Sequence, residues 1–535
     1  MDIRLKKDID EEFTTISVKK GITIEEVYLQ YKEELPFEVT AAKVNHKVVE
    51  LSAMLDRPCE LEFLDMRSQV GNLVYQNSIA LVYLKAINEL FGDADAEIAN
   101  PLNKGLYTEI KKPDGVMSGD IEAIERKMKE IVAEDLPIEK VRMKKHRDIK
   151  NNVLRFYEID GYKNFFYGKL VPSTGYLDKF QLRPYRRGVV LTFPNQSNPG
   201  QLPPPTDEPN MYAAFGEMAK WQRLLGINFV EDLNNKIRRR QMKEVIQLSE
   251  ALHEKKIVEI AGKILKEKKR IILIAGPSSS GKTTFARRLC VQLRVAGLKP
   301  LYLGTDDYFL ERENTPLDER GEKNFEDIEA LDLNLFNDHM NRLLAGEEVD
   351  IPTFNFLTGH KEYGRRKTSI GKTQPIVIEG IHALNEKLTS HIPQSSKYKI
   401  YISPLTQLNI DRHNRIPTTD ARLLRRITRD YQYRGKSAEG TIKQWPSVRR
   451  GEEKNIFPFS KEADVFFNSA HIYEISVLKK YVEPLLMTVG SHCPEYSEAQ
   501  RLLDFLSFFE TFDGNDVILN NSILREFIGG SVFID

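Results

Sequence analysis

The sequence predicts an α/β protein whose catalytic part is built on a doubly wound parallel sheet with a phosphate-binding loop. The apolar run 271–275 is typical of a buried strand, and residues 276–283, G-P-S-S-S-G-K-T, follow it at once and match G-x-x-x-x-G-K-[ST]. Apolar spacing over 285–293 predicts a helix after the loop. Two further strand-like runs, 300–304 and 375–379, end at or beside carboxylates, where ligands bind in such sheets.

The loop itself predicts a nucleotide site. Its glycines let backbone N–H groups turn toward phosphate oxygens, Lys282 reaches the β and γ phosphates, and the Thr283 hydroxyl is placed to hold Mg²⁺. We therefore expect ATP or GTP to bind here with Mg²⁺. The expected contacts come from Gly276, Ser278, Ser279, Ser280, Gly281, Lys282, Thr283 and Thr284.

Two carboxylates are the candidates for chemistry beside this loop. Asp306 could accept the proton of an attacking hydroxyl, or hold Mg²⁺ through water. Glu379 ends the strand-like run 375–379 and suits the acidic position of a Walker-B-like strand, which orients Mg²⁺ or water beside Thr283.

Four arginines, Arg422, Arg425, Arg426 and Arg429, share one helix face because residues three and four apart are neighbours. A solvated basic face is the usual explanation of such a run. After a phosphate-binding loop, a mobile lid that closes over triphosphate is the better interpretation.

Length and composition limit the class of protein. A chain of 535 residues predicts three or four domains. The 78 basic and 78 acidic residues balance, which argues against a chain that coats nucleic acid over its whole surface. Three scattered cysteines, a polar N-terminus and the lack of a long apolar run predict a cytoplasmic protein with no membrane span.

We expect five segments. Residues 1–65 mix short strands with a helix near 24–35, and residues 66–194 combine amphipathic helices, including 77–91 and 121–134, with strands. Residues 195–269 comprise a proline-rich linker and a charged helical connector. The catalytic domain is expected over 270–485, and a helical tail without assigned chemistry over 486–535.

The front of the chain resembles the N-terminal half of threonyl-tRNA synthetase, a TGS domain of the β-grasp type followed by an α+β editing-type domain. Five short runs carry the resemblance, in this order: T-A-A-K-V-N-H-K-V-V-E-L-S (40–52), L-F-G-D-A (90–94), P-L-N-K-G-L-Y (101–107), M-K-E-I-V (128–132) and V-P-S-T-G (171–175).

The metal-type site of that editing domain is lost. Its histidines and cysteine align with Gln76, Ala80, Phe166 and Leu170, and of these neither the alanine, the phenylalanine nor the leucine can bind a metal or move a proton. We expect this part to act as a scaffold, with homo-oligomerisation as one role, or to retain contact with RNA or tRNA.

The region from about residue 270 to 480 resembles the uridine kinase and phosphoribulokinase family. Its motifs, in order, are G-P-S-S-S-G-K-T-T (276–284), T-D-D-Y-F (305–309), N-F-E-D-I-E-A-L-D (324–332), I-P-T-F-N-F (351–356), I-E-G-I (378–381) and R-R-I-T-R-D (425–430). The resemblance implies ATP-dependent phosphorylation of a nucleoside 5′-hydroxyl, with Asp306 as base. It also implies phosphate or substrate contacts from Arg426, Arg429 and Arg434, with Tyr308 and Gln444 near the substrate.

Three positions depart from the pyrimidine-kinase pattern. Glu326 replaces the aspartate expected on the ribose hydroxyls, Phe354 lacks a tyrosine hydroxyl beside the base, and the base-reading histidine is displaced to His360. Because a site built for hydrogen bonds discriminates strongly, these changes affect specificity more than chemistry.

Three alternatives stay open beside a nucleoside kinase. A P-loop GTPase is disfavoured, because the chain lacks an Asn-Lys-x-Asp motif. An RNA- or tRNA-associated protein with regulatory nucleotide binding would use the basic run 238–240. A relative acting on another small alcohol, such as a sugar phosphate or a pantothenate-like acid, would yield no product from nucleosides.

Overall fold

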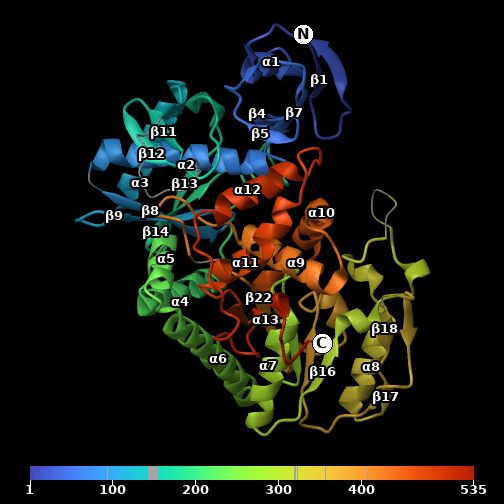
Figure 1. Ribbon diagram of the computed structural model, residues 1–535. Coiled ribbons are helices and arrows are strands. Elements are labelled where there is room, and N and C mark those ends of the chain that lie inside the picture. The colour runs from blue at the N-terminus through green and yellow to red at the C-terminus, as the bar shows by residue number, and fades with distance from the viewer. Residues whose placement is uncertain are drawn as a thin grey trace.

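The computed structural model describes residues 1–92, 94–141, 155–317, 321, 323–355, 357–406 and 408–534. Asp93 of the L-F-G-D-A run and Phe356 of the I-P-T-F-N-F run lie outside the described residues. The front of the chain forms two units beside the larger part that holds the parallel sheet, and the C-terminal helices lie between them (Figure 1).

The central sheet is parallel and five-stranded, in the order β16 (Leu301–Gly304), β21 (Ile376–Glu379), β15 (Ile271–Ala275), β22 (Lys397–Ser403), β23 (Val465–Asn468). All three strands that the sequence predicts are confirmed, and β15 lies in the middle. Because side chains alternate along a strand, Ile272 and Ile274 enter one core, and Ile271, Leu273 and Ala275 enter another. The sheet is therefore buried on both faces, as a doubly wound fold requires.

Helices cover both faces of this sheet. One core includes Phe285 of α7 (Lys282–Val295) and Leu423 of α9 (Thr418–Arg434), and the other includes Phe336 of α8 (Leu333–Ala345). Two helices follow α9, namely α10 (Ala438–Asn455) and α11 (Glu474–Met487). Two small hairpins, β17 (Val349–Asp350) with β20 (Lys367–Thr368) and β18 (Thr353–Asn355) with β19 (His360–Glu362), extend from the α8 side.

The first front unit is a mixed sheet in the order β2 (Thr14–Ser17), β1 (Asp2–Lys6), β7 (Glu60–Asp65), β4 (Val39–Val44), β5 (Lys47–Val49). A short pair, β3 (Ile22–Thr23) with β6 (Met54–Leu55), lies beside it. The helix α1 (Ile24–Leu29) starts at a capping box between Thr23 and Glu26. It is shorter than the expected 24–35, because its buried positions end at Tyr28 and a separate 3₁₀ turn covers Lys32–Glu34.

The second front unit packs two helices on antiparallel strands. Its four-stranded sheet has the order β13 (Gln181–Tyr185), β14 (Gly188–Thr192), β9 (Gly105–Lys111), β8 (Asp95–Leu102), and β10 (Glu139–Val141), β11 (Phe156–Ile159) and β12 (Tyr162–Phe165) form a second sheet. α2 (Gln69–Phe91) begins eight residues before the expected start at residue 77. The Ser68 side chain caps its N-terminus by accepting a hydrogen bond from the Gly71 backbone N–H. α3 (Ser118–Ala133) matches the expected helix closely.

The connector consists of three helices, α4 (Pro209–Leu225), α5 (Val230–Arg238) and α6 (Met242–Lys266). Gly226 ends α4 in the left-handed conformation with φ of 64°, which a glycine adopts without strain. The proline-rich stretch before α4 contains no helix or strand over residues 195–208, as the sequence predicts.

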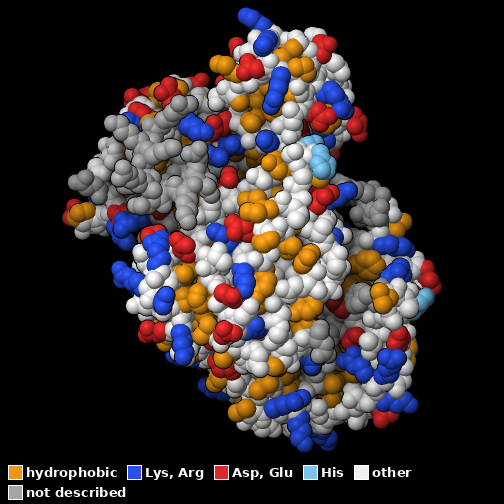
Figure 2. Space-filling view, viewed as in Figure 1, with side chains coloured by type: hydrophobic (Ala, Val, Ile, Leu, Met, Phe, Trp, Pro, Cys, Tyr) orange, Lys and Arg blue, Asp and Glu red, His pale blue; other side chains and the backbone are white. Residues whose placement is uncertain are grey.

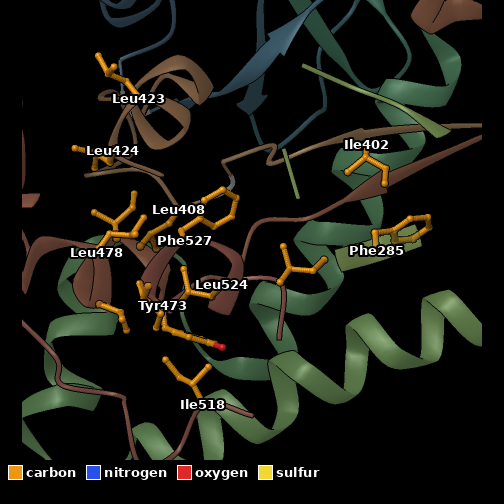
Figure 3. Close-up of a cluster of buried hydrophobic side chains, with 14 of the residues drawn as sticks. Phe285, Ile402, Leu408, Leu423, Leu424, Tyr473, Leu478, Ile518, Leu524 and Phe527 are labelled. Carbon is orange, nitrogen blue, oxygen red and sulfur yellow. The ribbon is translucent and has the colours of Figure 1, made fainter. Parts of the chain in front are cut away.

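The C-terminal tail joins the front of the chain to the sheet. α12 (Tyr496–Leu506) contacts the second front unit, since the Tyr167 hydroxyl donates to the Arg501 carbonyl at 2.9 Å. After α12, the described part of the tail contains one further helix, the short α13 (Arg525–Ile528). Figure 3 shows Leu524 and Phe527 beside Leu478 of α11 and Tyr473, the residue just before that helix, so the tail completes the core next to α9.

Basic and acidic side chains are interspersed over the face drawn in Figure 2, in keeping with the balanced charge of the sequence. Within the part of the chain that the structure describes, no helix is both long and apolar enough to cross a membrane.

Candidate active site

A cavity of about 340 Å³ opens at the carboxyl edge of the parallel sheet. The P-loop, the turn after β16, the end of β21 and the helix α9 meet there, as the sequence predicts for strands whose carboxyl ends share one edge. Its lining is Ser278, Ser279, Ser280, Gly281, Lys282, Thr283, Asp306, Phe309, Phe325, Glu326, Glu379, Gly380, Ile381, Arg426, Arg429, Arg434 and Glu526.

The P-loop is fixed by close backbone contacts. A side chain at Gly276 would collide with the Ile402 carbonyl oxygen on the neighbouring strand β22. Gly281 has φ of 82°, a conformation that only glycine adopts readily, and it is the residue from which α7 begins. The N-terminus of α7 therefore points at the cavity and favours an anion there.

Thr283 and Glu379 form the pair that the sequence predicts for Mg²⁺. The Thr283 hydroxyl donates to Glu379 Oε1 at 3.0 Å, and the Tyr302 hydroxyl donates to the same oxygen at 3.0 Å. A hydroxyl beside a carboxylate oxygen suits the oxygen ligands that Mg²⁺ prefers. Burial raises the pKa of Glu379. Lys282 lies next to this pair, with its ammonium donating to the Gly276 carbonyl at 3.0 Å.

Asp306 faces the cavity without a hydrogen bond or ion pair to any other described residue, which leaves its oxygens available to a ligand. Removal of water from its carboxylate raises the pKa of Asp306 to about 6, and the negative charge of Glu379 contributes to the rise. Burial also raises the pKa of Glu326, and Glu452 adds to that effect. Carboxylates crowded into one cavity favour binding of a cation or a proton.

Three arginines line the opposite wall. Arg426 donates to the Ser278 hydroxyl at 2.8 Å, and Arg426, Arg429 and Arg434 all form ion pairs with Asp430, at 3.2, 3.2 and 3.3 Å. Asp430 is only 1% exposed, so this one buried carboxylate holds three guanidinium groups at the cavity. Guanidinium groups held in place suit bidentate binding of phosphate.

The other two arginines of the predicted stripe do not face the cavity. Arg422 pairs with Glu452, and Arg425 pairs with Glu474 at 2.6 Å; all four side chains are 3% exposed or less. The anions between these guanidinium groups are carboxylates of the protein, not phosphates. This half of α9 is therefore packed into the core, and the interpretation of the whole stripe as a mobile lid is wrong for Arg422 and Arg425.

These buried ion pairs also fix the P-loop backbone through hydrogen bonds. Arg422 donates to the Ser278 carbonyl at 3.0 Å, and Arg425 donates to the Ser279 carbonyl at 3.4 Å. Glu452 accepts from the Ser278 backbone N–H at 3.0 Å. Because both members of each pair have lost their water, neither can be removed without leaving an unpaired buried charge.

Four residues that the family resemblance implies near the substrate lie outside the cavity. Tyr308 is fully buried, with its hydroxyl 3.1 Å from His339 Nδ1, and Phe354 packs on Phe309 with ring centroids 5.7 Å apart. His360 is exposed and lies 2.8 Å from Glu311. Gln444 is exposed on α10. Their substrate roles stay predictions.

The tail supplies a residue that the sequence does not reveal. Glu526 of α13 lines the cavity and accepts hydrogen bonds from the Thr284 backbone N–H at 3.3 Å and from its hydroxyl at 2.8 Å. It lies more than 240 residues from the P-loop and beyond every motif, so no local pattern could have indicated it.

The cavity as a whole combines a P-loop with carboxylates and arginines. This is the arrangement of a P-loop kinase.

Comparisons with known proteins agree with this class. The family model described as Phosphoribulokinase / Uridine kinase family matches residues 271–476. A uridine kinase of Chloroflexus aurantiacus is 30% identical over 200 residues, which cover 37% of this chain and 85% of that protein. A uridine kinase of Mycoplasma genitalium is 32% identical over 183 residues, which cover 34% of this chain and 76% of that protein. The chain belongs to the phosphoribulokinase and uridine kinase family.

A relative of another kind confirms the resemblance to threonyl-tRNA synthetase. Threonine–tRNA ligase 2 of Bacillus subtilis is 29% identical over 182 residues, which cover 30% of this chain. Those residues span only 28% of the length of the ligase. The similarity is therefore to a part of the ligase.

We expect Glu452→Gln to destabilise the protein by about 3–5 kcal/mol, because it leaves Arg422 buried without its anion. The neighbouring Glu453→Gln is the matched control, with an expected change of about 0–1 kcal/mol, since Glu453 is 36% exposed and pairs only with Arg449. Urea unfolding of both variants measures the difference, and equal effects would contradict the anchoring role of Glu452.

Proposed function

We propose that the protein is an ATP- and Mg²⁺-dependent kinase that phosphorylates the 5′-hydroxyl of a nucleoside. The observation that carries the proposal is the single cavity shared by the P-loop, Asp306 and Arg429. The P-loop and Lys282 would bind the triphosphate, Asp306 would accept the hydroxyl proton, and Arg426, Arg429 and Arg434 would stabilise charge on the transferring phosphoryl group. Thr283 and Glu379 would hold Mg²⁺, which when bound neutralises phosphate charge.

Two aromatic residues of the same cavity support a nucleoside as the acceptor. Phe309 and Phe325 line it, with ring centroids 5.7 Å apart and planes nearly perpendicular. Aromatic rings in such a pocket suit a planar base. Glu326 lines the same cavity, where the charge of Arg426 acts on it, and its carboxylate could accept hydrogen bonds from ribose hydroxyls.

We propose the division into a kinase domain (270–485) and two front domains (1–65 and 66–194), with the front acting as a scaffold. The RNA-linked alternative gains no support from the basic run 238–240, because Arg238 already pairs with Glu231 at 2.9 Å and with Glu510 at 3.5 Å. RNA contact and homo-oligomerisation stay predictions.

The direct test is transfer of phosphate from ATP·Mg²⁺ to a panel of nucleosides, sugar phosphates and other small alcohols. We expect product from one or a few nucleosides, and a loss of kcat of at least about 10²-fold in Asp306→Asn, which removes the base. Lys282→Ala should also lose activity. Asp307→Asn is the matched control, because Asp307 pairs with Arg366 and does not line the cavity. Product only from a non-nucleoside alcohol would refute the nucleoside substrate.

The activity should fall as the solution becomes acidic. Asp306 must be deprotonated to accept a proton, and its pKa is raised from 3.8 to about 6 in the folded protein. We therefore expect kcat/KM to decline as pH drops through about 6, instead of near 4 as for an ordinary aspartate. A pH profile that stays flat down to pH 4.5 would contradict the assignment of Asp306 as the base.

Glu526→Gln should strengthen ATP binding by about fivefold, equivalent to roughly 1 kcal/mol. The change removes a negative charge beside the phosphate site and keeps an oxygen for the Thr284 hydroxyl. Calorimetric titration with ATP·Mg²⁺ measures it, with Glu510→Gln as the control because Glu510 of the same tail is far from the cavity lining and pairs with Arg238. Weaker binding in Glu526→Gln would mean that the carboxylate takes part in binding the nucleotide.

A further inference from the structure

A second cavity, of about 320 Å³, lies where the front units meet the C-terminal helices. Its walls come from β5, α2, the segment 167–169 after β12, the segment 414–417 before α9, and α12. It shares no lining residue with the kinase cavity. Figure 1 shows α12 near α2, and residues of both helices line the cavity.

Positive charge predominates in this second cavity. Four cationic residues, Lys47, Arg155, Lys169 and Arg415, line it together with the carboxylate of Asp504. Arg501 also lines it, but this guanidinium is already neutralised by Asp420, with two bonds of 2.7 Å, and by Glu498 at 2.7 Å. Apart from Arg501, the lining therefore has four cationic side chains and one carboxylate, and Glu50, which is not part of the lining, adds a second negative charge that acts on Lys169.

These cations have few partners of their own. Arg155 donates to the Gly168 carbonyl at 3.2 Å and lies 3.7 Å from Asp504. Among the residues that the structure describes, Arg415 donates only to the Ile416 carbonyl, at 3.4 Å. Lys169 has no hydrogen bond or ion pair to any residue that the structure describes. Burial lowers the pKa of Lys169 to about 8 and that of Arg415 to about 10, and the charge of Arg155 adds to the shift of Lys169. The nearby carboxylates, Glu50 and Asp504 for Lys169 and Asp420 for Arg415, offset these shifts only in part.

The rest of the lining is apolar or aromatic. Val70, Leu73 and Val74 of α2 line it together with Tyr167 and Tyr496. Few polar groups set in an apolar wall are typical of small-molecule sites, and the volume lies in the range of such sites. A nucleic-acid strand would require a basic track along the surface, whereas this positive charge is gathered inside one cavity.

We propose that this cavity binds a small organic anion, a phosphate monoester or a carboxylate carried on an apolar body. The anionic group would lie against Lys169, Arg155 and Arg415, and the apolar body against α2 and the two tyrosines. This site is independent of the kinase reaction proposed above, and its binding can be measured without phosphate transfer.

The test is a calorimetric titration of the full chain with phenyl phosphate and, separately, with benzoate. Both are measured in the Lys282→Ala background, which removes the P-loop lysine and so weakens any binding at the kinase cavity. Phenol is the uncharged control. We expect binding of at least one of the two anions at one site per chain, and no binding of phenol. The anion that binds identifies phosphate or carboxylate as the preferred group.

Two further substitutions locate the site. Lys169→Met should weaken binding at least about tenfold, since a charge-assisted hydrogen bond is lost. Lys163→Met is the matched control, because Lys163 is 52% exposed on β12 and pairs with Glu158, and it should bind as before. Leu73→Trp should also abolish binding by filling the cavity. Lys169→Met should melt no lower than its parent, because it removes an unpaired buried charge.

Three results would overturn the proposal. The first is that neither anion binds, and the second is that Lys169→Met and Lys163→Met bind equally. The third is that a single-stranded RNA binds in a Lys169-dependent manner while phenyl phosphate and benzoate do not, which would assign the cavity to nucleic acid.

Discussion

The active-site geometry depends on two buried ion pairs, Arg422 with Glu452 and Arg425 with Glu474. Both of these arginines, which belong to α9, also donate to a carbonyl of the P-loop, so the loop is tied to α9 and, through the glutamates, to α10 and to α11. Charges this deeply buried are stable only while they are paired, because the cost of removing them from water is recovered only by their mutual attraction and hydrogen bonds. The pairs therefore restrict the loop to one position relative to three helices.

The arginines of α9 fall into two groups according to their position on the helix: one group is buried in ion pairs, and the other reaches the cavity. Arg422 and Arg425 face inward to glutamates, whereas Arg426 and Arg429, on the neighbouring part of the helix surface, reach the cavity and share Asp430. Asp306, Glu326 and Glu379 face them. A cavity with both crowded carboxylates and fixed guanidinium groups suits a ligand that brings phosphate and a metal ion together, and burial keeps the pKa of its carboxylates raised.

Local sequence was enough to predict the strands at 271–275 and 376–379, the P-loop between β15 and α7, and the meeting of Asp306 with Glu379, because each depends on a short pattern and on the parallel order of strands. It could not show which arginines of the stripe find carboxylate partners, since Glu452 and Glu474 lie 30 and 49 residues away. Glu526 was missed for the same reason. The start of α2 depends on the cap at Ser68, and the end of α1 depends on burial, which stops at Tyr28. Apolar periodicity alone does not fix either limit.

The central claim is that a nucleotide lies between the P-loop and the arginines of α9. A crystal structure with a non-hydrolysable ATP analogue and Mg²⁺ tests it most directly. We predict phosphates in contact with the P-loop backbone and with Arg426 or Arg429, the metal ion beside Thr283 and Glu379, and the Glu526 carboxylate moved away from Thr284. A nucleotide bound elsewhere, with Glu526 still on Thr284 and the arginines still engaged only by Asp430, would contradict the account.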